Sequence, residues 1–178
     1  MTTTQTMLTL RSNEAREQIM TWFGTLQSEH KNAERAQLRR CASVAEVLWH
    51  REYYSLLSKL KANGIQLRYR SDEHALAAIV GLLAHVKTHN SSAKIGRQLA
   101  QTQNGKRGLS DLRFRRLLAA QTIDEVAPHF RRAIQLKDGA INVHSLLQIL
   151  SQWRPDAEYA SPGANPRIQL AEQFYSVK

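Results

Sequence analysis

The sequence predicts an all-α protein, a two-lobed helical bundle of about eight to nine helices. Apolar residues recur every three to four positions along almost the whole chain, and this spacing places them on one side of a helix. Asn-Gly, Asp-Gly and proline-containing segments separate these stretches, as turns do. Only residues 65–70 alternate between apolar and polar, and we expect an extended connection without a strand partner there.

Length and composition indicate one globular unit. The 178 residues, 42% of them hydrophobic, can bury a substantial core. We expect a flexible tail over residues 1–11 and two lobes, 12–90 and 91–178, joined in one compact unit. No apolar run approaches the roughly 18 residues of a membrane span, and the N-terminus does not resemble a secretory signal. The single cysteine fits the reducing cytoplasm, where we expect the protein to reside.

The elements of the first lobe follow from their caps. Ser12 is the expected N-cap of a helix near residues 13–29, and a short basic helix near 32–41 follows. Ser43 and Glu46 have the capping-box spacing that opens the next turn of helix. The remaining helices of this lobe should end at Asn63-Gly64 and begin at Ser71-Asp72.

The second lobe begins with a helix near residues 93–103, which breaks at residues 104–108 and resumes at Ser110. Thr122 and Glu125 form a second capping box. Since an interior proline removes a helical hydrogen bond, Pro128 predicts a kink or a fresh helix start. Two more helices are expected, one with an apolar stripe from Val143 to Trp153 and one that begins at Asn165-Pro166.

The chain offers little that suggests catalysis. His85 and His89 have the i, i+4 spacing of metal ligands, but Val86 stands where a zinc protease carries its general-base glutamate. We therefore expect surface histidines near a helix end, and no metal or cofactor. The N-G-K-R-G loop lacks P-loop spacing, and neither a G-x-S-x-G elbow nor a Cys-x-x-Cys motif occurs. No Ser/His/Asp triad is indicated by the sequence, so we predict a protein that is not an enzyme.

Positive charge is concentrated in the middle of the chain. The net charge is +10, and residues 91–137 hold 10 of the 25 basic residues but only 3 of the 15 acidic ones. A local surplus of this kind favours a polyanionic partner. A membrane surface is the weaker alternative, because no long helix pairs this charge with a Trp/Phe-rich side.

The stretch LSDLRFRRLLAA shows how the arginines are arranged. On a helix, Phe114 and Leu117 share the apolar side, Arg113 flanks it, and Arg116 points away. Asp111 can pair with Arg115, yet no acid separates Arg113 from Arg116. An ordinary solvated helix face would explain this stretch taken alone.

The same arrangement recurs in AQLRRC and in HFRRAIQL, which favours a composite basic face. Lys94 adds to its charge. An arginine guanidinium binds a phosphate through two hydrogen bonds, and such binding is salt-dependent and indifferent to base sequence. The chain has no convincing helix-turn-helix unit for base readout. The candidate nucleic-acid-binding residues are Arg39, Arg40, Arg97, Lys106, Arg107, Arg113, Arg116, Arg131 and Arg132.

From about residue 12 to its end, the sequence resembles the CasB family, the small subunit of the type I-E CRISPR surveillance complex Cascade. The motifs that carry this resemblance are, in order, L-R-R, Y-Y-S-L-L, G-R-Q-L-A, R-F-R-R-L-L, F-R-R-A-I, a V-x-x-L-L helix followed by tryptophan, and A-E-Q-F-Y. Each motif is short, and their order and spacing give the resemblance its specificity.

The resemblance implies a two-lobed helical protein without catalytic activity that binds nucleic acid regardless of sequence. Two copies would lie in contact along the complex, against the backbone subunits that hold the guide RNA. There they would contact the guide–target hybrid and help to hold the displaced DNA strand. Carried over by motif, the contacts are Arg39 or Arg40, Arg97, Arg113 or Arg116, and Arg131 or Arg132, whereas Lys106 and Arg107 rest on charge alone.

Two other classes of function stay open. One is a helical transcription regulator that reads a defined DNA site. The other is an assembly protein whose basic face docks on acidic protein surface. A CRISPR operon around the gene would favour the family assignment over both.

Overall fold

Ten α-helices make up most of the described chain, and the all-α prediction is confirmed with a slightly larger number of helices than expected. The computed structural model describes residues 8–102, 105, 108–155 and 158–176. The predicted contacts Lys106 and Arg107, and residues 1–7 of the expected tail, lie outside the described residues. The helices are α1 Asn13–Leu26, α2 Asn32–Arg40, α3 Val44–Val47, α4 Arg51–Ala62, α5 Arg70–Leu83, α6 Ile95–Ala100, α7 Asp111–Ala119, α8 Ile123–Leu136, α9 Val143–Leu150 and α10 Pro166–Tyr175. None of these helices is long and apolar enough to span a membrane.

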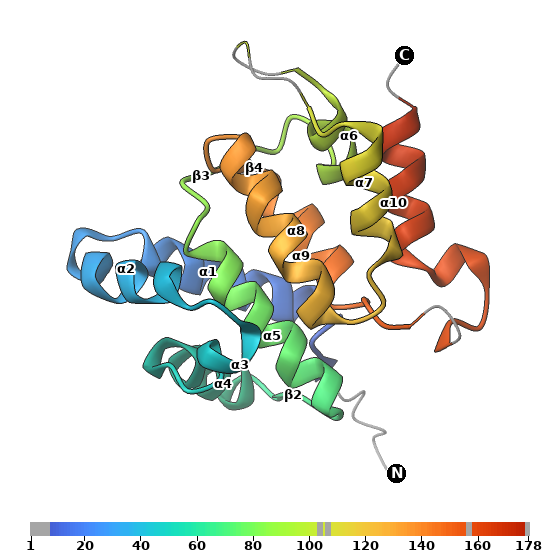
Figure 1. Ribbon diagram of the computed structural model, residues 1–178. Coiled ribbons are helices and arrows are strands. Elements are labelled where there is room, and N and C mark those ends of the chain that lie inside the picture. The colour runs from blue at the N-terminus through green and yellow to red at the C-terminus, as the bar shows by residue number, and fades with distance from the viewer. Residues whose placement is uncertain (1–7, 103–104, 106–107, 156–157, 177–178) are drawn as a thin grey trace.

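Helix α5 lies at the centre of the fold, with α3 and α4 on one side and α8 and α9 on the other (Figure 1). Its residues from Ala75 to Leu83 are all buried, which suits a helix that is covered on every side. One continuous hydrophobic core runs from Leu10 to Phe174 and includes residues of both expected lobes. A boundary near residue 90 stays a prediction, since the two parts share this core.

Four of the helix N-caps predicted from local sequence are confirmed, whereas the helix expected to begin at Ser71-Asp72 begins at Arg70, with Tyr69 as its N-cap. The hydroxyls of Ser12, Ser43 and Thr122 accept hydrogen bonds from the backbone N–H groups three residues later, and the Asn165 side chain accepts one from Arg167. The Glu125 carboxylate in turn accepts from the N–H of Gln121 at 2.7 Å, which completes this cap. The helix expected near residues 93–103 is shorter, because α6 ends at Ala100.

Two short parallel strand pairs were not predicted. Strand β1 (Leu8–Thr9) pairs with β2 (Ile65–Gln66), and β3 (Thr88–His89) pairs with β4 (Ala140–Ile141). The expectation that residues 65–70 have no strand partner is therefore wrong. The expectation of a flexible tail is also wrong for residues 8–11, because β1 is hydrogen-bonded and Leu10 is only 1% exposed. Strand partners more than fifty residues apart leave no local signal in a sequence.

Pro128 does not start a new helix, so that alternative is wrong, while a kink at this position stays a prediction. The helix runs from Ile123 to Leu136 with the proline inside it. Pro128 is exposed, so the carbonyl that loses its hydrogen bond faces water and can be hydrated. The buried residues of the helix, Phe130 among them, hold it against the core on the other side.

Candidate nucleic-acid interface

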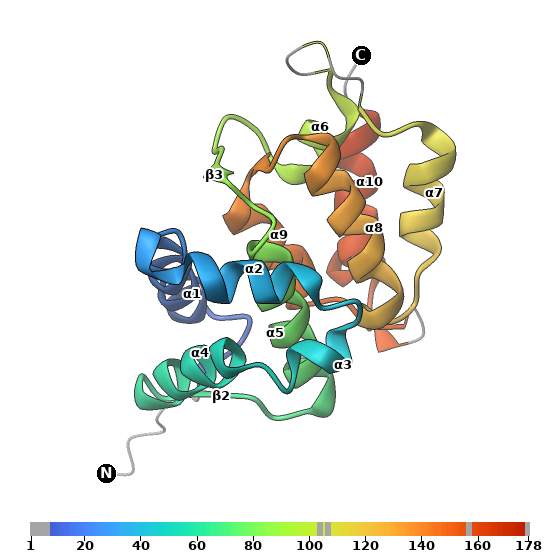
Figure 2. The same cartoon turned by 60° about the vertical axis from the view of Figure 1, so that its left-hand side comes forward.

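Six of the predicted arginines come from three helices that lie on one side of the molecule. Figure 2 shows α2 and α8 toward the viewer, with α7 beside α8. We define the arginine face by its members, which are Arg39 and Arg40 on α2, Arg113 and Arg116 on α7, and Arg131 and Arg132 on α8.

Two members of the arginine face also hold the fold together. The Arg39 Nε donates to the carbonyl oxygen of Ala84 at 2.6 Å, at the C-terminal end of α5. The Arg131 Nη2 donates to the carbonyl oxygen of Cys41 at 2.8 Å, just beyond α2, and its Nε is buried without a partner. These contacts fix α2 against α5 and α8, so the two side chains have a structural role beside any binding role.

Two histidines are near the arginines electrostatically. The sequence analysis expected His85 to be a surface histidine and did not consider His129. Burial and the charges of Arg131 and Arg39 lower the pKa of His85 from 6.5 to about 4, and its Nε2 is buried without a partner. Burial and the charges of Arg132 and Arg116 likewise lower the pKa of His129. Burial first, and the neighbouring positive charges second, therefore favour the neutral form of both imidazoles. His129 directly precedes the F-R-R motif, and this position was the sequence signal that could have identified it.

The other four members of the arginine face are exposed and unpaired. Within the described chain, no hydrogen bond or ion pair engages the guanidinium of Arg40, Arg113, Arg116 or Arg132. Arg115 behaves differently: it forms the predicted ion pair with Asp111, whose carboxylate also accepts from the Tyr175 hydroxyl at 2.6 Å. The solvated-face explanation therefore applies to Arg115 and leaves Arg113 and Arg116 without acidic partners.

Arg97 does not join the arginine face. It is exposed on α6, which packs against α10, and both views separate these helices from α2 (Figures 1 and 2). Beside it, Lys94 precedes α6 as its N-cap residue. The structure thus divides the predicted composite face into two basic surfaces.

The predicted histidine pair is not a helical pair. Helix α5 ends at Leu83, and His89 lies in β3, where its Nδ1 accepts from the N–H of Val143 at 3.1 Å. Its ring packs edge-on against that of His144. Among the described residues, no group of three His, Cys, Asp or Glu side chains is placed to hold a metal ion.

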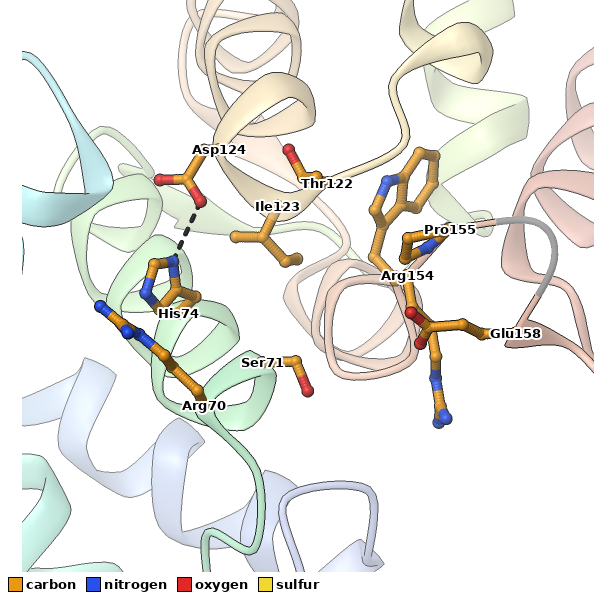
Figure 3. Close-up of a pocket in the computed structure, with 10 residues that line it drawn as sticks. Arg70, Ser71, His74, Thr122, Ile123, Asp124, Arg154, Pro155 and Glu158 are labelled. Atoms are coloured by element: carbon orange, nitrogen blue, oxygen red, sulfur yellow. Dashed lines mark hydrogen bonds and ion pairs between the residues drawn. The ribbon is translucent and has the colours of Figure 1, made fainter.

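A hollow of about 370 Å³ lies between the N-terminal ends of α5 and α8 (Figure 3). It contains a serine, a histidine and an aspartate, the residue types of a hydrolytic triad. His74 Nδ1 and Asp124 Oδ2 are 3.0 Å apart, but the Ser71 hydroxyl points away from the imidazole (Figure 3). A nucleophile needs its base within hydrogen-bond reach, so this arrangement does not form an activated serine.

Exposed aromatic side chains are a further feature that the sequence analysis did not identify. Trp49 is 89% exposed and Tyr54 53% exposed, although they occupy the two positions of a hydrophobic staple at the start of α4. Because Trp49 projects into solvent, it makes little use of that packing. The sequence signal for this exposed aromatic pair was the i, i+5 spacing of Trp49 and Tyr54 around the N-cap residue His50.

Comparisons with known proteins point to one family. The family model described as CRISPR-associated protein Cse2 matches residues 34–175. A CRISPR-associated protein of the Cse2 family from Thermus thermophilus has a similar structure, with a TM-score of 0.65 and 23% identity over 91% of this chain and 98% of that one. The structure of CasB from Thermus thermophilus matches with a TM-score of 0.64 and 20% identity over the same shares. At these identities the structures show a shared fold. A search of curated proteins finds no match.

Proposed function

Because this chain belongs to the Cse2 family of CRISPR-associated proteins, subunits of Cascade, we propose that it binds nucleic acid without sequence preference and stabilises the R-loop. In this role it contacts the guide RNA–target DNA hybrid region and the displaced DNA strand, and it catalyses no reaction. The exchange of a DNA duplex for a hybrid is nearly balanced in free energy, so modest contacts to a phosphate backbone can tip it.

The observation that carries this proposal is the set of four exposed, unpaired arginines on the arginine face. Arg116 and Arg132 lie on neighbouring helices, and after burial their charges are the causes that lower the pKa of His129. Repulsion between unpaired guanidiniums costs free energy in the isolated chain. Phosphate groups would relieve that repulsion, and each would gain paired hydrogen bonds from a planar guanidinium.

The proposed partners follow from the same role. They are the guide RNA, the target DNA, the backbone and large subunits of Cascade, and a second copy of this chain, all in the cytoplasm. Exposed Trp49 favours a protein–protein contact in particular, because tryptophan is enriched at the centres of such interfaces.

A matched pair of variants tests the proposal. Arg116→Glu with Arg132→Glu should weaken binding to single-stranded DNA, duplex DNA and RNA alike, by tenfold or more, and flatten the dependence of log K on log salt. Lys59→Glu with Lys61→Glu makes the same change in net charge on exposed positions of α4 and should leave affinity within about threefold of the original. Filter binding or fluorescence anisotropy at several salt concentrations measures both.

Three results would contradict the proposal. Equal losses in the two double variants would show that net charge alone matters and not the arginine face. A preference above roughly 10³ for one DNA sequence over random DNA would instead identify a regulator that reads a defined site. Salt-independent binding, or none, would favour an assembly protein.

A further inference from the structure

A second basic surface lies in a hollow between α6 and α10. This α6–α10 hollow has a volume of about 300 Å³ and is lined by Ser92, Ala93, Lys94, Arg97, Gln173 and Ser176. None of the six members of the arginine face lines it. It lies away from α2 (Figures 1 and 2), whereas α7 packs against α10 through the stacked rings of Phe114 and Phe174.

The lining of the α6–α10 hollow contains two cations and no carboxylate. Lys94 and Arg97 are exposed, and the side chain of neither forms a hydrogen bond or ion pair within the described chain. The large hollow of Figure 3, by contrast, includes Asp124 and Glu158 in its lining. An anion entering the α6–α10 hollow therefore meets no acidic side chain among the residues that line it.

The Gln173 side chain is oriented to donate into this hollow. Its Oε1 accepts a hydrogen bond from the Gly96 N–H at 3.1 Å, which leaves the amide NH₂ group for a ligand. The orientation is held by close packing, since a Cβ at Gly96 would lie only 2.6 Å from the Gln173 Cβ and 2.7 Å from the Leu170 carbonyl oxygen.

The backbone around the two cations is also fixed in place. The N–H of Ile95 donates to the Ser145 hydroxyl at 3.0 Å, and Gln98, which is buried, donates to the carbonyl of Asn90 at 2.8 Å. Lys94 and Arg97 thus project from a segment anchored on both sides. A preorganised set of donors loses less entropy on binding than mobile side chains do.

We propose that the α6–α10 hollow binds a phosphate group of the nucleic-acid backbone, with Lys94, Arg97 and the Gln173 amide as donors. This inference rests on the proposed function and adds a second contact to the strand, separate from the arginine face. The C-terminal end of α10 at Ser176 carries partial negative charge, so the two cations must supply the attraction. A phosphate suits this set because its oxygens accept from donors of several directions at once.

Nuclear magnetic resonance of the full chain tests the site directly, with inorganic phosphate and a dT₁₂ oligonucleotide as separate probes. Both should shift the Gln173 side-chain amide and the Arg97 Nε–H signals. Lys94→Gln with Arg97→Gln should abolish the phosphate-induced shift of the Gln173 side-chain amide and lower oligonucleotide affinity by three- to tenfold. The matched control is Lys59→Gln with Lys61→Gln, which should bind both probes as the original does.

A third variant separates loss of the site from loss of the fold. Gln173→Glu has nearly the same shape and keeps an oxygen for Gly96, but it replaces the donating NH₂ group with a second acceptor oxygen. It should abolish the phosphate-induced shift of the Arg97 Nε–H signal while its thermal unfolding and circular dichroism stay close to those of the original.

The outcomes distinguish the inference from the proposed function. If the hollow variants bind the oligonucleotide normally while the arginine-face variant does not, the inference is overturned and the proposed function stands. If phosphate shifts the two signals and the oligonucleotide does not, the hollow is a site for free phosphate, and its assignment to a strand is overturned. Absence of shifts with both probes overturns the site altogether.

Discussion

Arg167, at the start of α10, is only 5% exposed and shows what a structural arginine looks like in this protein. Its guanidinium donates to the carbonyl oxygens of Ala120 at 2.6 Å and Arg154 at 2.8 Å, and it lies 4.3 Å from the centre of the Trp153 ring. These contacts close the α7–α8 connection against α10. Arg132, which is exposed and has no partner within the described chain, is the opposite case.

Arg167→Lys should lower the free energy of unfolding by about 2–4 kcal/mol, because a lysine cannot reproduce the planar set of donors and leaves buried carbonyls unsatisfied. The matched change Arg132→Lys should alter it by less than about 0.5 kcal/mol, as expected for an exposed site. Urea unfolding of both variants measures the difference, and similar losses would refute this division of roles.

His85 makes stability depend on pH. Its folded-state pKa of about 4 lies below the ordinary 6.5, so between these values the unfolded chain binds the proton and the folded chain does not. The free energy of unfolding should therefore be highest above pH 6.5 and fall as the pH drops toward 4. The His89 and His129 pKa values are lowered too and act in the same direction.

The variant His85→Gln isolates the contribution of this one side chain. The difference in unfolding free energy between the original and H85Q should become less favourable to the original as the pH falls from 7 to 4.5. A difference that is constant over this range would show that His85 does not titrate as described.

At the scale of elements, features that depend on residues close together in the sequence were predicted correctly, and features that depend on distant residues were not. The caps at Ser12, Ser43 and Thr122 depend on residues three positions apart, and all three were predicted. The β1–β2 pair depends on the pairing of Leu8 with Ile65, which are far apart in the chain. The local sequence of neither segment indicates this pairing. The alternative of a fresh helix start at Pro128 was wrong because the effect of this proline depends on which side of the helix faces water, a property of packing.

The contact between α6 and α10 requires a glycine, and Gly24 in α1 offers a matched comparison. Gly96→Ala should destabilise the protein by about 1–3 kcal/mol, since its Cβ would meet Gln173 and the Leu170 carbonyl oxygen at less than contact distance. Gly24→Ala has nothing within 4 Å and should stabilise α1 by up to about 1 kcal/mol. Thermal unfolding of both variants checks the opposite signs, and two changes of the same sign would refute the packing argument.

At the scale of the whole molecule, the sequence shows which segment holds the excess positive charge but not how the fold distributes that charge over the surface. Residues 91–137 hold the excess, yet Arg97 and Arg132 from this one segment belong to different basic surfaces. The arginine face also includes Arg39 and Arg40, which come from far earlier in the chain. Helix periodicity gives the direction of a side chain relative to its own helix, whereas the position of one helix against another depends on tertiary packing.

Two separate surfaces imply that the length of a bound strand matters. A strand that reaches both surfaces binds the second one as an intramolecular step, so each surface raises the overall affinity. With a long strand, the losses from Arg116→Glu/Arg132→Glu and from Lys94→Gln/Arg97→Gln should multiply when the two pairs are combined, because distant sites contribute additively in free energy. With an oligonucleotide too short to reach both surfaces, the combined variant should lose little more affinity than the arginine-face variant alone.

Anisotropy titrations with a series of oligonucleotide lengths, at fixed salt concentration, measure these losses. Losses that multiply equally at every length would mean that one continuous surface binds the strand.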